Sequence, residues 1–238
     1  MDIIVSVSDK YLWALKPFCY LFNKYWDNRQ KVFIIGYKKP DFVLPDNFIF
    51  YSIAYEQYQK NRWADGIISF LNLQTFKTFV LFLEDYWICR YVDVRGVMLL
   101  NDFISSRDDI LRIDLTSDRL YASGCRDVGY YNRFDIIEAP QSEYQMSLQC
   151  GIWNREIFLS VLSKLNDDRS PWNIELSGTT IVNSHGYIVY GTRQYPVRYV
   201  NAMNNSTQDK INLIGLNIHD IDMVKSLLGE GFNGRYNA

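Results

Sequence analysis

The stretch Thr78–Leu83, TFVLFL, followed at once by Glu84 and Asp85, decides the fold that we expect for this chain. After its first residue the stretch is continuously apolar, which is typical of a central strand buried on both faces of a parallel sheet. The two acids then end the strand abruptly. We therefore expect a parallel sheet with polar groups at the edge where this strand ends.

The segments around this strand alternate between two periodicities. Short β-branched or apolar runs predict further strands, and longer segments with apolar residues on one stripe predict helices. The expected strands are 3–7, 31–37, 48–53 and 110–115, and the expected helices are 12–26, 63–76 and 95–105. This alternation predicts an α/β fold with a mostly parallel central sheet flanked by helices on both faces.

The second half of the chain is less regular. We expect an extended segment at 147–153, helices at 154–164, from Ser170-Pro171 onward and at 220–228, a strand at 187–190, and a loop at 201–210. Serine followed by proline is a helix start, an N-cap and then the first helical position. The 238 residues contain no repeat or interdomain linker, so we predict one domain covering 1–238.

The charge composition argues against a dedicated nucleic-acid-binding protein. The net charge is −2 and the pI is near 5.7, whereas such proteins usually carry a basic stripe. Arginines do recur between residues 107 and 133, but acids are interleaved with them. We expect this segment to form a solvated face of mixed charge.

The cysteines and the N-terminus bear on location. The four cysteines are far apart and form no CxxC pair, which favours reduced thiols over zinc or disulfides. Asp2 stands where a secretion signal needs positive charge, and no apolar run approaches the roughly 20 residues that span a bilayer. We expect a soluble, cytoplasmic protein with no membrane span.

Two polar clusters follow predicted strands. Ser8-Asp9 comes after the first strand and Glu84-Asp85 after TFVLFL. In open parallel sheets ligands bind beyond the carboxyl ends of the strands. The acidic pair fits either a divalent cation, which prefers carboxylate oxygens, or a solvated turn.

These features together resemble a GT-A glycosyltransferase, a single Rossmann-like domain that moves a sugar from a nucleoside-diphosphate donor. The resemblance implies that 1–105 binds the nucleotide sugar, by default a UDP-sugar, and that 106–238 binds the acceptor. It also implies Mn²⁺ or Mg²⁺ at an Asp-x-Asp motif. Here Asp85 is the first choice of ligand and Glu84 the second. The full motif is lacking, so a metal-independent enzyme stays open.

On the donor side the resemblance implies contacts from Ser8, Asp9 and the segment Arg62-Trp63-Ala64-Asp65. Arginine can pair with phosphate and aspartate can accept from ribose hydroxyls. An acid in the first turn of a helix, stabilised by the helix dipole, is the alternative interpretation for Asp65.

On the acceptor side the resemblance implies Gln149, Trp153, Trp172 and Glu175. In a helix that begins at Pro171, Trp172 and Glu175 share a face. Glu175 is predicted to be the base that deprotonates the acceptor hydroxyl, giving a single displacement with inversion. An exposed glutamate beside a packing tryptophan, or a retaining route without a base, remains open.

Two histidines, His185 and His219, are weighed as extra metal ligands, with ordinary surface histidines as the alternative.

The predicted acceptor is a glycan or other small hydroxyl compound. Similar compact enzymes occur in phages, where some modify hydroxymethylated bases in DNA, so modified DNA in a host cytoplasm is the second option. Two other functions compete. Sugar nucleotidyltransferases need a glycine-rich loop after the first strand, and Ser8–Tyr11 has no glycine. The second competing function is a non-catalytic nucleotide- or sugar-binding module of the same fold.

Overall fold

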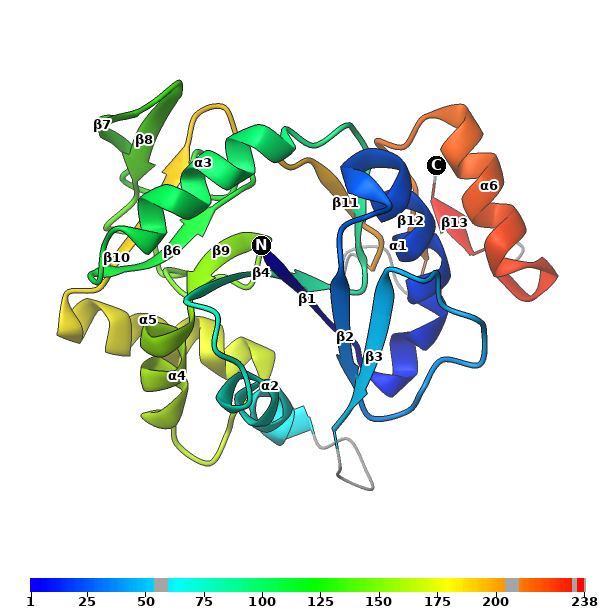
Figure 1. Ribbon diagram of the computed structural model, residues 1–238, viewed down its shortest axis with the longest axis horizontal. Helices are drawn as coiled ribbons and strands as arrows, with labels where there is room; N and C mark the ends of the chain where they lie inside the picture. Colours follow the sequence, from blue (N-terminus) through cyan, green and yellow to red (C-terminus); the bar gives the residue numbers. More distant parts are fainter. Residues whose placement is uncertain (54–59, 204–209, 233–234, 238) are drawn as a thin grey trace.

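The computed structural model describes residues 1–53, 60–203, 210–232 and 235–237, which form one α/β domain (Figure 1). Its central sheet has nine strands in the order β3-β2-β1-β4-β9-β6-β10-β8-β7. The strands of this sheet are β1 (Asp2–Ser6), β2 (Val32–Gly36), β3 (Phe48–Ser52), β4 (Thr78–Leu83), β6 (Ile110–Asp114), β7 (Arg126–Tyr131), β8 (Phe134–Glu138), β9 (Gly151–Asn154) and β10 (Ile188–Thr192).

The sheet is mostly parallel, as predicted. Strands β3, β2, β1 and β4 are parallel neighbours, and β6 is parallel to β10. Only β8 and β9 run antiparallel to both of their neighbours, so the other seven of the nine strands share one direction. Two smaller pairings lie outside this sheet, β5 (Tyr86–Ile88) with β11 (Tyr199–Asn201) and β12 (Ile211–Asn212) with β13 (Tyr236–Asn237).

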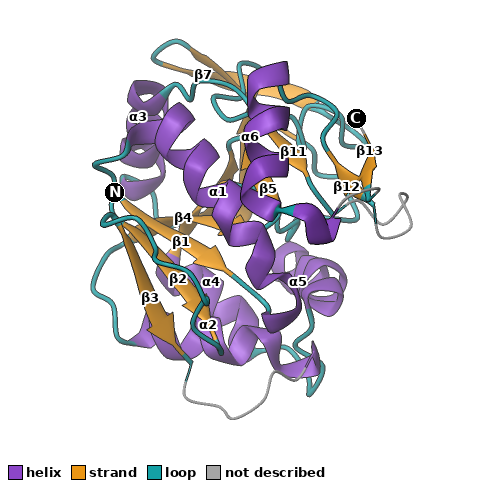
Figure 2. Cartoon of the chain, turned by 90° about the vertical axis from the view of Figure 1, so that its right-hand side faces the viewer, coloured by secondary structure: helices purple, strands orange, loops and turns teal. Residues whose placement is uncertain are grey.

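Helices cover both faces of the sheet (Figure 2). On one face lie α1 (Leu15–Phe22), α3 (Val94–Ser105) and α6 (Ile218–Leu228), and on the other α2 (Trp63–Asn72), α4 (Arg155–Ser163) and α5 (Pro171–His185). Because side chains of a strand alternate between faces, β4 serves both cores. Val80 and Phe82 pack into one core, and Phe79 and Leu81 into the other.

Local chemistry sets the helix ends that the sequence predicts. The Ser170 side chain caps α5 by accepting from the backbone N of Asn173 at 3.4 Å, and Pro171 occupies the first turn. The helix ends at Gly186, whose φ of 68° lies in the left-handed region that glycine tolerates. Asn154 caps α4 in the same way, and Gly229 ends α6.

Several segments differ from the sequence-based expectation. The helix expected at 12–26 is α-helical only over Leu15–Phe22, and the helix expected at 63–76 ends at Asn72. The β7–β8 hairpin was not predicted, because every residue of β7 except Tyr131 is exposed and the strand shows no apolar alternation. The stretch 147–153 is a strand only from Gly151 onward. Of the expected loop 201–210, Asn201 ends β11, while 204–209 lie outside the described residues.

The expectation of a solvated, mixed-charge face at residues 107–133 is wrong for its centre. Arg112 and Asp114 on β6 are fully buried, and Arg119 is 1% exposed. The flanking Arg107 and Arg126 do lie at the surface. The error arises because arginines and aspartates that form buried ion pairs alternate in the sequence in the same way as those on a solvated face.

Candidate active site

A cleft opens where β1 and β4 end. The two strands are parallel neighbours with Ser6 opposite Leu83, so the residues after them meet at one edge. The Ser8 backbone N and Oγ both donate to Glu84 Oε1, at 3.2 Å each. The turn after β1 is thereby tied to the turn after β4, and Glu84 is buried at 7% exposure.

Asp85, the next residue, also lines the cleft and is half-buried, so it is more exposed than Glu84. Its backbone O accepts from Ala202 N at 2.8 Å, which ties the turn after β4 to the segment after β11. Burial raises the pKa of Asp85, and burial together with the charge of Asp85 raises the pKa of Glu84. Two carboxylates crowded in this way attract positive charge.

Glu175 approaches the cleft from α5. Its Oε1 accepts from the backbone N of Leu148 at 2.8 Å, and burial raises the pKa of its carboxyl group. Trp172, one turn earlier, lines the same cleft and is 52% exposed. The side-chain amide of Gln149 also faces the cleft and makes no hydrogen bond to a described residue.

The cleft has a volume of about 540 Å³ and joins segments that are far apart in the chain. Seven of the predicted site residues line it, namely Ser8, Trp63, Glu84, Asp85, Gln149, Trp172 and Glu175. They come from both 1–105 and 106–238. Their roles, and the division of labour between these two ranges, stay predictions.

Three donor-side candidates lie elsewhere. The Asp9 carboxylate accepts from the backbone N of Lys38 at 3.1 Å and so binds the segment after β2. Asp65 forms ion pairs with Arg62 at 2.6 Å and Arg169 at 2.7 Å. None of Asp9, Arg62 and Asp65 lines the cleft. Asp65 fits the alternative interpretation, an acid in the first turn of α2.

Trp153 does not line the cleft either. It is fully buried in β9, with its ring against Phe158 and the Arg112 guanidinium 5.1 Å from its centroid. An acceptor would have to unfold the sheet to reach it. His185 and His219 are exposed and lie outside the cleft, with His185 against Lys164 at the end of α5.

Sequence reasoning missed several residues of the cleft, namely Lys10, Tyr11, Tyr86, Asn201 and Met203. Lys10 and Tyr11 follow Ser8 in the same turn. The rule that ligands bind beyond the carboxyl ends of parallel strands could therefore have identified them. Asn201 and Met203 arrive through the pairing of β11 with β5, for which the sequence carries no signal. Among the described residues that line the cleft, Lys10 is the only basic one.

The acidic pair fits a divalent cation in part. Within 1–53, 60–203, 210–232 and 235–237 no three His, Cys, Asp or Glu residues converge as a complete metal site. Glu84 and Asp85 still offer the hard oxygen ligands that Mg²⁺ and Mn²⁺ prefer. Ligand phosphate and water would have to complete the coordination shell, as is usual for Mg²⁺.

Comparison with known proteins leaves the family open. No protein-family model and no curated protein sequence matches the chain. Among solved structures, a cytidylyltransferase from Leptospira borgpetersenii is similar at 9% identity and a TM-score of 0.47, covering 80% of this chain and 74% of that one. A putative glucose-1-phosphate thymidylyltransferase from Bacillus anthracis has 11% identity and a TM-score of 0.47, with 99% of both chains covered.

The glycosyltransferase GlyE of Streptococcus pneumoniae is similar at 8% identity and a TM-score of 0.41, over 79% of this chain and 45% of that one. Similarity at this level says nothing about activity, and we base the proposed function on the residues of the cleft. None of the helices in the described part of the chain has the length and apolar composition needed to cross a bilayer.

Proposed function

We propose that the protein is a glycosyltransferase that moves a sugar from a nucleoside-diphosphate donor, by default a UDP-sugar, to an acceptor hydroxyl with inversion. One observation carries the proposal. The acidic pair Glu84-Asp85 and the separate carboxylate Glu175 line the same cleft at the carboxyl ends of β1 and β4. Such a transfer needs neutralisation of the charge on the leaving diphosphate, which a cation bound by the acidic pair would supply, and a base at the acceptor.

The donor would lie on the β1–β4 side. Asp85 is the better placed of the two acids to bind Mn²⁺ or Mg²⁺, because Glu84 is occupied by the Ser8 backbone N and Oγ. The cation would neutralise the charge that develops on the leaving diphosphate. Lys10 adds positive charge at the same side, and Trp63 and Tyr11 offer rings to the nucleoside.

Glu175 would act on the acceptor. Its Oε1 is held by Leu148 N, which leaves Oε2 to take the proton of the acceptor hydroxyl. The acceptor oxygen then forms a bond to the anomeric carbon while the bond to the diphosphate oxygen breaks and its electron pair leaves with the diphosphate. A raised pKa makes Glu175 a stronger base than an ordinary glutamate.

A thermal-shift screen of UDP, GDP, CMP and their sugars, with and without Mn²⁺, tests the donor site. A ligand at about 100 times its Kd should stabilise the fold by roughly 2.7 kcal/mol. We expect one nucleotide to stabilise more strongly with Mn²⁺, and Asp85→Ala to remove the metal effect. Asp41→Ala, an exposed aspartate outside the cleft, is the matched control and should behave as wild type.

The same ligands separate the competing functions. Formation of pyrophosphate from a nucleoside triphosphate and a sugar 1-phosphate would replace the proposal with a sugar nucleotidyltransferase. Nucleotide binding without donor hydrolysis or transfer under any condition would favour a non-catalytic binding module. If no nucleotide stabilises the fold, the glycosyltransferase proposal fails.

A further inference from the structure

A second cavity, of about 600 Å³, adjoins the cleft. The two share Gln149 and Glu175 in their walls, so whatever fills the second cavity lies beside the proposed base. The remainder of its wall comes from the segment after β6, residues 117–123, and from residues 141–147 before β9.

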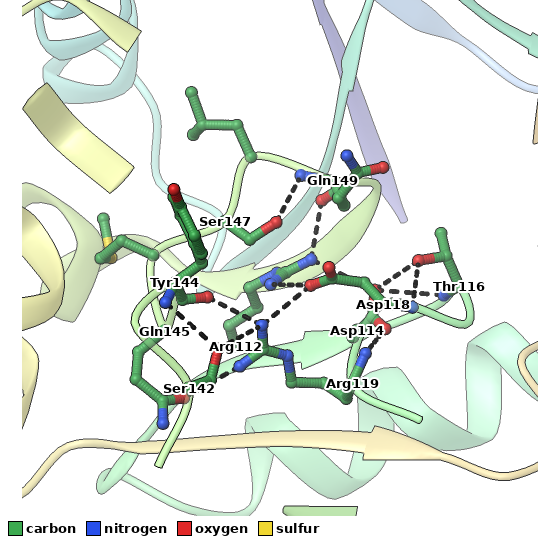
Figure 3. Close-up of polar contacts among 12 residues, drawn as sticks. Arg112, Asp114, Thr116, Asp118, Arg119, Ser142, Tyr144, Gln145, Ser147 and Gln149 are labelled. Carbon is green, nitrogen blue, oxygen red and sulfur yellow. Dashed lines mark hydrogen bonds and ion pairs between the residues drawn. The ribbon is translucent and has the colours of Figure 1, made fainter. Parts of the chain in front are cut away.

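Hydrogen bonds from two buried arginines, Arg112 and Arg119, connect residues of the cavity wall (Figure 3). The Arg119 guanidinium donates to Asp118 at 3.0 Å, Gln145 at 3.1 Å and the Tyr144 backbone O at 2.8 Å. Arg112 lies 3.6 Å from the same Asp118 carboxylate, whose side chain is 25% exposed. The two wall segments are therefore cross-linked, and Asp118 presents a fixed carboxylate to the cavity.

Charge decides which ligands this cavity can accept. Asp118, Glu143 and Glu175 bring three carboxylates to its wall, and Arg119 is the only basic residue among the described residues that line it. The Arg119 guanidinium is buried and already donates to its neighbours. A phosphodiester chain needs cationic contacts to its phosphates, so this wall disfavours DNA.

The remaining wall chemistry suits a polyhydroxylated, uncharged ligand. Hydroxyl and amide groups come from Ser117, Ser123, Ser147, Gln141 and Gln149. Two tyrosine rings are accessible, Tyr121 at 80% and Tyr144 at 46% exposure. Carboxylates and amides accept from sugar hydroxyls, and a ring face covers the apolar face of a pyranose.

We infer that this cavity binds a neutral saccharide, which presents its hydroxyl to Glu175 as the acceptor. The inference rests on the proposed function for the transfer itself, but binding of the saccharide does not depend on a donor. It narrows the acceptor from two classes, glycan or modified DNA, to one.

Binding to a printed array tests the inference with the full chain and without nucleotide. The array carries neutral oligosaccharides, acidic oligosaccharides and single-stranded DNA with hydroxymethylcytosine. We expect signal on neutral saccharides only, and titration calorimetry with the strongest of them gives a Kd. Tyr144→Ala should weaken that Kd about tenfold through loss of the ring, whereas Tyr144→Phe should leave it near wild type.

The matched control is Tyr130→Ala, which removes a tyrosine that is 84% exposed on the β7–β8 hairpin and lies outside both cavities. It should leave the saccharide Kd unchanged, and none of the three variants should change the nucleotide thermal shift. Binding to DNA, or failure to bind any neutral saccharide, overturns the inference. If a nucleotide still stabilises the fold in that case, the proposed function remains supported. Tyr144-dependent saccharide binding without any nucleotide binding keeps the saccharide site and removes the proposed function.

Discussion

Two adjoining parts of the central sheet, strands β1 and β4 and strands β9 and β6, place their polar groups differently. In the β1–β4 part the strands are mostly apolar, and the polar residues Ser8, Glu84 and Asp85 follow the point where the strands stop. In the β6–β9 part Arg112 and Asp114 lie inside the sheet itself with no exposed surface. The first part therefore places its ionisable groups after the strands, and the second places an ion pair within the core.

This difference separates binding from stability. Burying an ion pair costs desolvation free energy that the attraction within the pair only partly offsets, so the buried charges on β6 must have a further role. The hydrogen bonds supply one, because Arg112 and Arg119 fix Asp118 and the backbone of residues 144–149. We therefore expect substitutions at strand ends to change activity and substitutions within β6 and β9 to change folding.

The largest expected effect is on activity at the cleft. Glu175→Gln keeps the acceptor for Leu148 N but loses the base, so we expect the transfer rate to fall about 10²- to 10⁴-fold with little change in unfolding free energy. Single-turnover kinetics and urea unfolding measure the two quantities. Glu156→Gln, which removes a carboxylate 83% exposed on α4, is the control and should leave both unchanged.

The pH profile gives the same prediction a second readout. Burial raises the pKa of Glu175 despite the hydrogen bond from Leu148 N, and the base works only when deprotonated. The rate should therefore fall as pH drops through a value above the ordinary glutamate pKa of about 4.3. An acid limb that persists in Glu175→Gln would assign the base to another group.

Next in size is the buried ion pair. Arg112→Met leaves Asp114 buried without its cation, for which we expect a loss of about 3–5 kcal/mol in the free energy of unfolding. Arg126→Met breaks an ion pair whose arginine is 66% exposed and should cost no more than about 1 kcal/mol. Equal losses in urea unfolding would show that the β6 charges do not act as core.

The sequence predicted the β1–β4 part of the sheet far better than the β6–β9 part. TFVLFL was predicted as a central strand, and β4 has the predicted bounds. The rule that ligands bind beyond the carboxyl ends of parallel strands pointed to Ser8, Glu84 and Asp85, which line one cleft. Their neighbours Asn201 and Met203 depend on the β5–β11 pairing, a long-range contact that leaves no local pattern. Arginines interleaved with acids are typical of an exposed segment, so the sequence did not predict that Arg112 and Arg119 are buried. Their burial depends on ion pairs and hydrogen bonds that form only in the folded chain.

A smaller effect tests how closely the buried charge is packed. A Cβ on Gly151 would lie 2.7 Å from Arg112 Nε and 3.0 Å from the backbone O of Ile113, so the strand leaves no room for it. We expect Gly151→Ala to lower the unfolding free energy by about 1–3 kcal/mol. The control is Gly231→Ala, where a Cβ meets nothing within 4 Å. A neutral Gly151→Ala would mean that Arg112 can shift, and that Asp118 is not held rigidly.

The smallest effect returns to the strand ends. Ser8→Ala removes one of the two hydrogen bonds to Glu84 and keeps the one from the backbone N, so we expect a loss of about 1 kcal/mol in unfolding free energy. Ser163→Ala, which removes an exposed hydroxyl on α4, should cost less. The informative readout is the nucleotide Kd. If Ser8 only ties the turns together, affinity should change no more than stability does. A larger loss of affinity would place the Ser8 hydroxyl in contact with the nucleotide donor. The same hydroxyl would then both bind the donor and stabilise the turn after β1 through Glu84.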